Sequence, residues 1–521
     1  MAILTLTSHL RTLLSKCRQA LLPVERHELI RVIPMGLLIF ALAFNYYVLR
    51  CVKDSMLTTA AHSGTEALPF AKIWVLIPMA FLLSAIFYKL SHRLNAVHLF
   101  SSIVGGFLAF FLLFALVIYP LGDTLHLHTI ADWLEGRLPK GFVGMIAVIR
   151  YWSYALFYVM AELWGSMCMT VLFWGYASEV TKLDEAKRFY SLFAIAANLA
   201  GVVAGPCSTC FARSGACWIG DSFYTSLLMT LGSVLIMGLA SIVIFSWLHN
   251  RVMSPRMEVT SQGIDKKLSK IRTKASFWGS FAQLRRSRYL LSIATVAIGY
   301  SVVSYLVEVV WKEQVRLTYP EKTLYNAYFG QVTFGIGIVS TIMAVFTSLA
   351  IRKFGWTRVA VITPTLLLLT SIGFFGLQFL PGGWTTTMGG LFGMSAANFI
   401  LFFGSAQNVL SRSCKYTVFD ATKEMCYIPL TKAARTQGKA AIDGVGSRLG
   451  KSGGAAVYQA LFIISGRTIT GLIPWVSGVL GLIFAGWILA VRQLGRSFAK
   501  IEAQQAAGPE EGLEPAAQAA S

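Results

Sequence analysis

Long apolar segments separated by short polar ones repeat along almost the whole chain. A transmembrane helix needs about 20 consecutive apolar residues, whereas a transmembrane β-barrel shows short segments of alternating hydrophobicity. The pattern therefore predicts an all-α integral membrane protein with twelve transmembrane helices. The predicted spans lie near residues 30–52, 70–89, 97–120, 142–178, 187–206, 222–248, 289–312, 325–350, 357–380, 386–411, 439–465 and 470–492.

The polar segments divide these spans into two sets of six. The longest polar break, residues 250–288, carries ten lysines and arginines against two acids. The segment 142–178 is too long for one straight crossing, so it must tilt strongly, protrude or begin with an interfacial segment. The chain is thus predicted to begin with a basic N-terminal segment (1–29), followed by a six-helix bundle (30–249) and a basic linker (250–288). A second six-helix bundle (289–492) and a tail with an acidic, disordered end (493–521) follow.

Composition and charge agree with a membrane protein. The 521 residues are 55% hydrophobic and 13% charged, against roughly 25% charged residues in soluble domains. The formal net charge of +21 is best explained by the enrichment of lysine and arginine in cytoplasmic loops, so we expect no nucleic-acid partner. Basic and non-basic loops alternate, which predicts that both termini and the central linker are cytoplasmic.

Six plus six spans around a cytoplasmic linker indicate a secondary transporter built from two related halves. A weak internal repeat supports this reading. When VLRCVKD is aligned with VEVVWKE, Lys53 and Asp54 fall on Lys312 and Glu313. Each pair lies at the end of the first predicted helix of its half.

Several ionisable residues fall inside or at the ends of the predicted spans. Lys53, Glu162, Glu308 and Lys451 lie in apolar surroundings, and Lys312 lies near a span end. A charge inside a membrane span costs about 2.5–3.5 kcal/mol and is a functional candidate by default. The alternatives are that the lysines near span ends extend to the interface, and that the glutamates pair with cations only to hold helices together.

The stretch DGVGSRLGKSGG places a lysine among glycines. Gly450-Lys451-Ser452 resembles the end of a phosphate-binding loop, but the required glycine five residues earlier is Val445. The glycines narrow a helix so that other groups can approach its backbone, although they could serve helix packing alone. Lys451, with Arg448 one turn earlier, would then present positive charge suited to phosphate.

Aromatic and amide side chains near these charges could recognise a nucleobase. Tyr154 and Tyr158 could stack on a base, and Asn198 and Asn408 could bind its edge. Core packing and hydrogen bonds between helices are the alternatives for these four residues.

The sequence contains no motif for a cofactor, a metal or catalysis. Cys207, Cys210 and Cys217 have no fourth nearby ligand to complete a zinc site. Lys451 has no accompanying acidic cluster of the kind that holds metal ions in kinases. We therefore expect a transporter rather than an enzyme, with no metal and no cofactor.

Long motifs carry a resemblance to a known family. The segments LRCVKDSM, MAELWGSM, VLFWGYASEVTKLDEAKRFY, LVEVVWKEQV, FDATKEMCYIPL and GKAAIDGVGSRLGKSGGA resemble the nucleotide transporters of plastids and of obligate intracellular bacteria such as chlamydiae, often called ATP/ADP translocases. The resemblance covers about residues 25–495. It implies a fold similar to the major facilitator superfamily and a multi-pass protein of the bacterial inner membrane that works by alternating access. We expect a monomer, because each half already supplies half of the site.

The resemblance also implies a function and the residues that perform it. Family members exchange host ATP for ADP or import nucleotides with protons. The four charged positions needed for transport in the family match Lys53, Glu162, Glu308 and Lys451. We expect Lys53 and Lys451, with Arg448 and Lys312, to hold phosphates.

The carboxylates are expected to act as partners of those cations. In this interpretation Glu162, Glu308 and Asp54 pair with the cations in the empty carrier and release them when nucleotide arrives. In a proton symporter one of the two glutamates would also carry the proton.

One departure from the family pattern keeps alternatives open. Exchangers typically read close to RDTKDTL around the first lysine, whereas this chain has Cys51 and Val52 before Lys53. ATP/ADP exchange is the expected function, and proton-coupled import of nucleoside triphosphates or of NAD-type nucleotides is the alternative. A carrier for another phosphorylated anion is a further alternative.

Overall fold

The computed structural model describes residues 27–181, 183–215, 222–253, 288–427, 442 and 447–506, and every regular element among them is a helix. The N-terminal part contains α2 (Leu29–Thr58), α3 (Ala67–Phe70), α4 (Ile77–Ser91), α5 (Ala96–Leu113), α6 (Gly122–Leu125), α7 (His128–Glu135), α8 (Val143–Arg150), α9 (Trp152–Trp164), α10 (Gly175–Val180), α11 (Leu183–Gly215) and α12 (Ser222–Trp247). The C-terminal part contains α15 (Arg288–Thr318), α16 (Lys322–Phe354), α17 (Trp356–Phe379), α18 (Gly382–Leu391), α19 (Ala396–Cys414), α20 (Asp420–Cys426), α22 (Ser447–Ser465) and α23 (Ile469–Ala506).

Ten helices of the described part are long and apolar enough to cross a membrane, several of them continued by π-helical turns. A bent pair, α18 with α19 and α20, passes the same test across a 77° break, and Ser452–Ser465 forms a shorter apolar helix. The prediction of an all-helical membrane protein is thus confirmed. The number of twelve crossings stays a prediction.

The long predicted segment 142–178 is divided in the structure. Helix α8 ends at Arg150, Tyr151 leaves helical geometry at φ −108° and ψ 48°, and α9 begins at Trp152. The crossing itself runs from Trp152 to Val180 and includes the π-helical segment Gly165–Trp174. The extra length is therefore a separate short helix before the span.

Helix ends follow local sequence signals. Asn95 accepts a hydrogen bond from the backbone N–H of His98 at 2.9 Å and begins α5. Ser395 plays the same part for Asn398 at the start of α19, at 3.3 Å. These side chains satisfy N–H groups that have no partner inside the helix. Gly355, with φ of 77°, separates α16 from α17 in a conformation that favours glycine.

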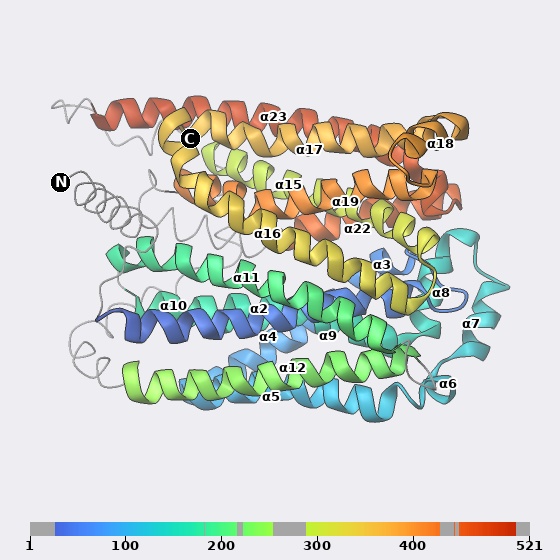
Figure 1. The fold of residues 1–521 in the computed structure, drawn as a ribbon, viewed down its shortest axis with the longest axis horizontal. Helices are drawn as coiled ribbons and strands as arrows, with labels where there is room; N and C mark the ends of the chain where they lie inside the picture. Colours follow the sequence, from blue (N-terminus) through green and yellow to red (C-terminus); the bar gives the residue numbers. More distant parts are fainter. Residues whose placement is uncertain are drawn as a thin grey trace, which may run out of the picture.

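The helices form two groups that lie side by side. In Figure 1, α2, α5, α9, α11 and α12 fill one half, and α15, α16, α17, α19 and α23 fill the other. Helices α11 and α16 pack against each other between the groups. A Cβ atom on Gly337 would lie 2.5 Å from the backbone nitrogen of Val202, and one on Gly205 would lie 2.6 Å from the carbonyl oxygen of Gly330. Glycine at these positions allows the two backbones to approach closely.

Further contacts join the halves at one end of the bundle. Gln459 Nε2 donates to the carbonyl oxygen of Pro69 at 2.9 Å, and the N–H of Ile469 donates to Glu66 Oε1 at 3.4 Å. This end carries α6, α7 and α18, and it lies opposite the start of α2 and the end of α23 (Figure 1). We call it the outer end, because the sequence predicts cytoplasmic termini.

Candidate functional site

Oppositely charged side chains from both halves meet in one chain of ion pairs. Lys53 Nζ lies 3.1 Å from Asp54 Oδ1 and 3.2 Å from Glu162 Oε2. Lys312 Nζ lies 2.8 Å from Asp54 Oδ2 and 3.1 Å from Glu308 Oε1. We call these five residues the charge network. Asp54 joins the two halves, because it lies on α2 and its partner Lys312 lies on α15.

The charge network is buried. The side chains of Lys53, Asp54 and Lys312 are 5%, 0% and 4% exposed, and those of Glu162 and Glu308 are 19% and 15% exposed. The two lysines therefore do not extend to the membrane interface, which was one alternative. Burying a charge is costly unless it is paired, so each side chain depends on its partners.

Helical spacing brings these side chains together. Glu308 and Lys312 are four residues apart on α15, and Arg50 is three residues before Lys53 on α2, so each pair shares a helix face. The ring centroid of Tyr158 lies 4.1 Å from Lys53 Nζ, a distance at which the ring stabilises the cation.

Three further cations border the network, and of these Arg50 and Lys72 are buried whereas Arg412 is half-buried. Arg412 Nη2 lies 2.7 Å from Glu308 Oε1. Arg50 is 4% exposed, and its Nη1 has no hydrogen-bond partner among the described residues. Lys72 is 6% exposed, with its Nζ 4.0 Å from the ring centroid of Tyr305. Both Arg50 and Lys72 interact electrostatically with Glu308.

Positive charge is therefore in excess at this site. The cations of the network and its border are Arg50, Lys53, Lys72, Lys312 and Arg412, and the carboxylates are Asp54, Glu162 and Glu308. A buried region with more cations than carboxylates can stabilise a multiply charged anion. It offers both lysine and the bidentate guanidinium groups that phosphate favours.

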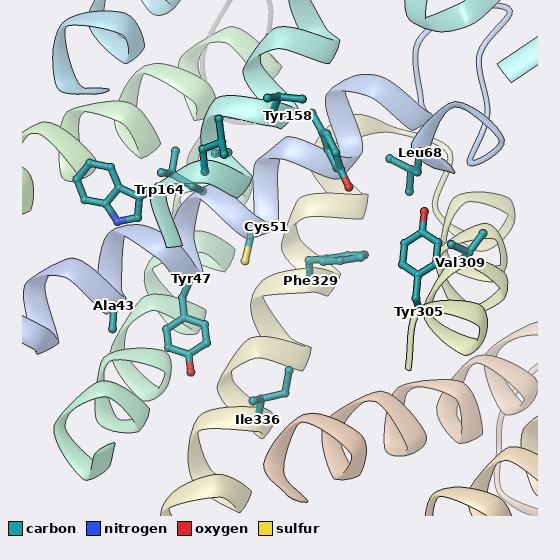
Figure 2. Close-up of a cluster of buried hydrophobic side chains, with 14 of the residues drawn as sticks. Ala43, Tyr47, Cys51, Leu68, Tyr158, Trp164, Tyr305, Val309, Phe329 and Ile336 are labelled. Atoms are coloured by element: carbon teal, nitrogen blue, oxygen red, sulfur yellow. The ribbon is translucent and has the colours of Figure 1, made fainter. Parts of the chain in front are cut away.

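An apolar core surrounds these charges. Figure 2 shows Tyr47 and Cys51 of α2 facing Phe329 and Ile336 of α16, with Tyr305 of α15 nearby. All five side chains are at most 4% exposed. Removing water from around the charges strengthens their interactions with one another and with a bound anion.

The predicted base-binding residues are distributed over several places. Tyr158 borders the network, whereas Tyr154 stacks on Tyr151, with ring centroids 5.6 Å apart, in an aromatic cluster nearer the outer end. Asn198 and Asn408 are 3% and 4% exposed, and the Nδ2 of the first and the Oδ1 of the second have no partner among the described residues. Asn408 lies one helical turn before Arg412, which places it on the side of α19 that faces the network.

The predicted phosphate-binding residues Arg448 and Lys451 lie on α22, and their side chains fall outside the described residues. The backbone of α22 packs closely on α15, because a Cβ atom on Gly450 would lie 2.6 Å from Ser301 Cβ. The helix that carries both residues therefore lies against the helix that carries Glu308.

A half-buried carboxyl group, that of Glu66, lies at the outer end, just before the span that begins at Ala67. Burial raises the pKa of Glu66, the nearby Glu313 raises it further, and Arg316 acts in the opposite direction. The N–H of Ile469 of the other half donates to Glu66 and also lowers this pKa, but burial has the larger effect. The surroundings of Glu66 thus include the other half, so its protonation depends on whether this end is closed.

Comparison with known proteins places this chain in a family. Residues 7–498 match the family described as "TLC ATP/ADP transporter". The chain belongs to this family. An "ADP,ATP carrier protein 1" of Chlamydia pneumoniae is 39% identical over 486 residues, covering 93% of this chain and 94% of that protein. The chloroplastic "ADP,ATP carrier protein 1" of Arabidopsis thaliana is 37% identical, covering 92% of this chain and 76% of that protein.

The chain is also similar to a solved structure. A crystal structure of a D-xylose–proton symporter superposes with a TM-score of 0.53 at 15% sequence identity, covering 90% of this chain and 97% of that one. The resemblance to nucleotide transporters is confirmed, and the fold is similar to that of this symporter.

Three bordering cations were not among the residues selected from the sequence. Lys72 interrupts the apolar run LPFAKIWVL, and Arg50 precedes Lys53 by one turn, so the rule for charges inside spans could have found both. The predicted span 386–411 ends just before Arg412, whereas α19 continues to Cys414 and places Arg412 beside Glu308.

Proposed function

We propose that this chain exchanges ATP for ADP across a bacterial inner membrane by alternating access between its two halves. Relatives that align with more than nine-tenths of the chain are named ADP,ATP carrier proteins. The observation that carries the proposal is the buried excess of cations where α2 meets α15. A multiply charged phosphate chain would neutralise that excess.

Phosphates and carboxylates compete for the same cations in this mechanism. In the empty carrier, Asp54, Glu162 and Glu308 hold Lys53 and Lys312. An arriving phosphate chain takes over these lysines, and Arg448 and Lys451 complete its site. The bond between Asp54 and Lys312 is then released, so the halves can separate at the outer end.

This competition explains why exchange would be obligatory. Without nucleotide, reorientation would require separation of buried ion pairs, which is costly. A bound nucleotide lowers that barrier only if it stabilises the intermediate between the two states more than it stabilises either end state. Nucleotide would therefore have to be bound in each direction.

The base is assigned to neighbouring side chains. Tyr158 lies beside Lys53 and can stack on a purine once the lysine holds phosphate, a contact worth about 1–3 kcal/mol. The unpartnered amide atoms of Asn198 and Asn408 supply donors and acceptors for its edge. Tyr154 would contact the base on its way to the outer end.

The proposed architecture has twelve crossings in two six-helix halves, residues 30–249 and 289–492. Ten full-length helices, the bent pair of α18 with α19 and α20, and α22 together supply that number. Both termini and the linker 250–288 are cytoplasmic, with 1–29 and 493–521 as terminal segments, and α23 extends helically to Ala506. Each half contributes charges to one site, so a monomer suffices, and the nucleotide crosses chemically unchanged without a cofactor.

The test is uptake of labelled ATP into proteoliposomes that contain the purified protein. Vesicles are loaded with ADP or left empty, and each is measured with and without a proton gradient. Uptake that requires internal ADP and ignores the gradient is the expected result. Uptake into empty vesicles that disappears with an uncoupler would instead indicate proton-coupled import, and uptake of phosphorylated sugars without ATP would indicate another anion carrier.

A further inference from the structure

Arg50 is a buried cation whose hydrogen-bonding capacity is incompletely used. It lies on α2 one turn before Lys53, is 4% exposed, and its Nη1 has no partner among the described residues. An arginine remains charged at any ordinary pH, and an unsatisfied buried donor is costly. A feature with such a cost, next to the proposed phosphate site, points to a ligand.

Arg412 approaches the same region from the other half. Its Nη2 lies 2.7 Å from Glu308 Oε1, the same oxygen that lies 3.1 Å from Lys312 Nζ. Arg50 and Arg412 both interact electrostatically with Glu308, and both interact with Tyr46 and Tyr47 of α2. Two guanidinium groups, one from α2 and one from α19, therefore act on the same carboxylate from the two halves.

Guanidinium differs from ammonium in the way it binds phosphate. Its planar fork donates two parallel hydrogen bonds to one phosphate group, whereas lysine acts as a compact point charge. Two arginines on opposite sides can therefore hold neighbouring phosphate groups in a fixed orientation. A single phosphate group cannot use both forks equally well.

We infer that Arg50 and Arg412 form a two-sided clamp on the phosphate chain, which selects nucleoside di- and triphosphates over monophosphates. Arg50 contacts phosphate first because its Nη1 is available. Arg412 then leaves Glu308 for the second phosphate group. This inference rests on the proposed nucleotide transport.

A purely structural role for Arg50, as a counterion of Glu308, explains less. Glu308 Oε1 already accepts from both Lys312 and Arg412. A counterion role also gives no use for the unpartnered Nη1 of Arg50. The two roles make different predictions for ligands of different phosphate number.

The experiment measures binding of ATP, ADP and AMP to the purified full-length carrier and to Arg50→Lys and Arg412→Lys, which keep the charge and remove the fork. Each substitution should weaken ATP and ADP binding about tenfold and AMP binding much less, in line with the loss of charge-assisted hydrogen bonds. Arg93→Lys, at an exposed arginine in the turn after α4, is the matched control. Thermal unfolding without ligand should be the same for all four proteins.

Three results would overturn the inference. The first is wild-type affinity for ATP in Arg50→Lys, and the second is an equal loss for all three nucleotides. The third is a lower unfolding temperature of ligand-free Arg50→Lys, which would indicate a structural counterion. A wild-type protein that binds none of the nucleotides would instead refute the proposed function, and the clamp with it.

Discussion

The ion pair between Asp54 and Lys312 gives the sharpest prediction, because it joins the halves through a fully buried carboxylate. Asp54→Asn keeps the size of the side chain and removes its charge. Lys312 then loses a partner at 2.8 Å and Lys53 loses one at 3.1 Å. Both lysines are at most 5% exposed, so neither is compensated by water while the outer end is closed.

The expected magnitude follows from this burial. Removing one partner of a buried ion pair typically costs about 3–5 kcal/mol, and opening the outer end would hydrate the lysines and remove that cost. Since each 1.4 kcal/mol is a factor of about ten, the ratio of closed to open molecules should fall roughly 10²- to 10³-fold. A carrier that is about 99% closed would then be about half open for a 10²-fold fall and roughly nine-tenths open for a 10³-fold fall.

Cys51 reports this opening. It lies one turn from Asp54, is 0% exposed, and its Sγ lies 3.5 Å from Thr333 Oγ1 of the other half. A membrane-impermeant maleimide is added to proteoliposomes, and modification of the peptide that contains Cys51 is followed by mass spectrometry. The modification rate should rise strongly in Asp54→Asn.

The control removes a salt bridge that lies within one half. Asp132 Oδ1 is 2.6 Å from Arg150 Nη1, both in the N-terminal part, so Asp132→Asn should leave Cys51 protected. Equal and slow modification of Cys51 in wild type and Asp54→Asn would refute the idea that this ion pair closes the outer end.

Further predictions address affinity, pH and packing. Glu308→Gln removes the carboxylate that holds two cations. ADP binding should therefore strengthen about tenfold, whereas ATP/ADP exchange in vesicles should slow. Unchanged ADP binding would contradict the release mechanism. Burial raises the pKa of Glu66, so the protonated carboxyl group is favoured when the outer end is closed. Closure should therefore be strongest at low pH and should be lost as the pH rises through the raised pKa. Glu66→Gln should abolish this pH dependence of Cys51 labelling, and a dependence that persists must come from another group. Gly337→Val places a side chain 2.5 Å from a backbone nitrogen of α11, so it should lower the free energy of unfolding by about 1–3 kcal/mol in thermal unfolding. Gly232→Ala, whose added methyl group meets open space, should not. Equal unfolding of the two variants would disprove the close helix contact.

The sequence predicted the fold class and the position of most helices. Long apolar segments are a direct consequence of bilayer thickness, so both ends of α12 and α17 were located to within one residue. Breaks inside apolar segments were harder to find. The interruption at Tyr151 and the bend between α18 and α19 depend on tertiary packing, which apolar length does not encode.

The charged site was partly predictable for a related reason. A charge inside an apolar segment is costly, so Lys53, Glu162 and Glu308 could be selected individually. Their partners could not be assigned, because pairing across the halves depends on how α2 and α11 pack against α16. Arg412 was missed, since the end of an apolar segment does not reveal whether an arginine is buried.

The most direct test of the whole account measures both directions of transport in the same vesicles. Proteoliposomes are loaded with ADP that carries one label, and external ATP carries a second label. ATP influx and ADP efflux are then measured together for the wild type, Lys53→Gln and Lys89→Gln. Lys89 is an exposed lysine near the end of α4 and serves as the control. The account predicts one ADP released for each ATP taken up in wild type and Lys89→Gln, and almost no movement of either label in Lys53→Gln. ATP influx without ADP efflux, or undiminished exchange by Lys53→Gln, would contradict it.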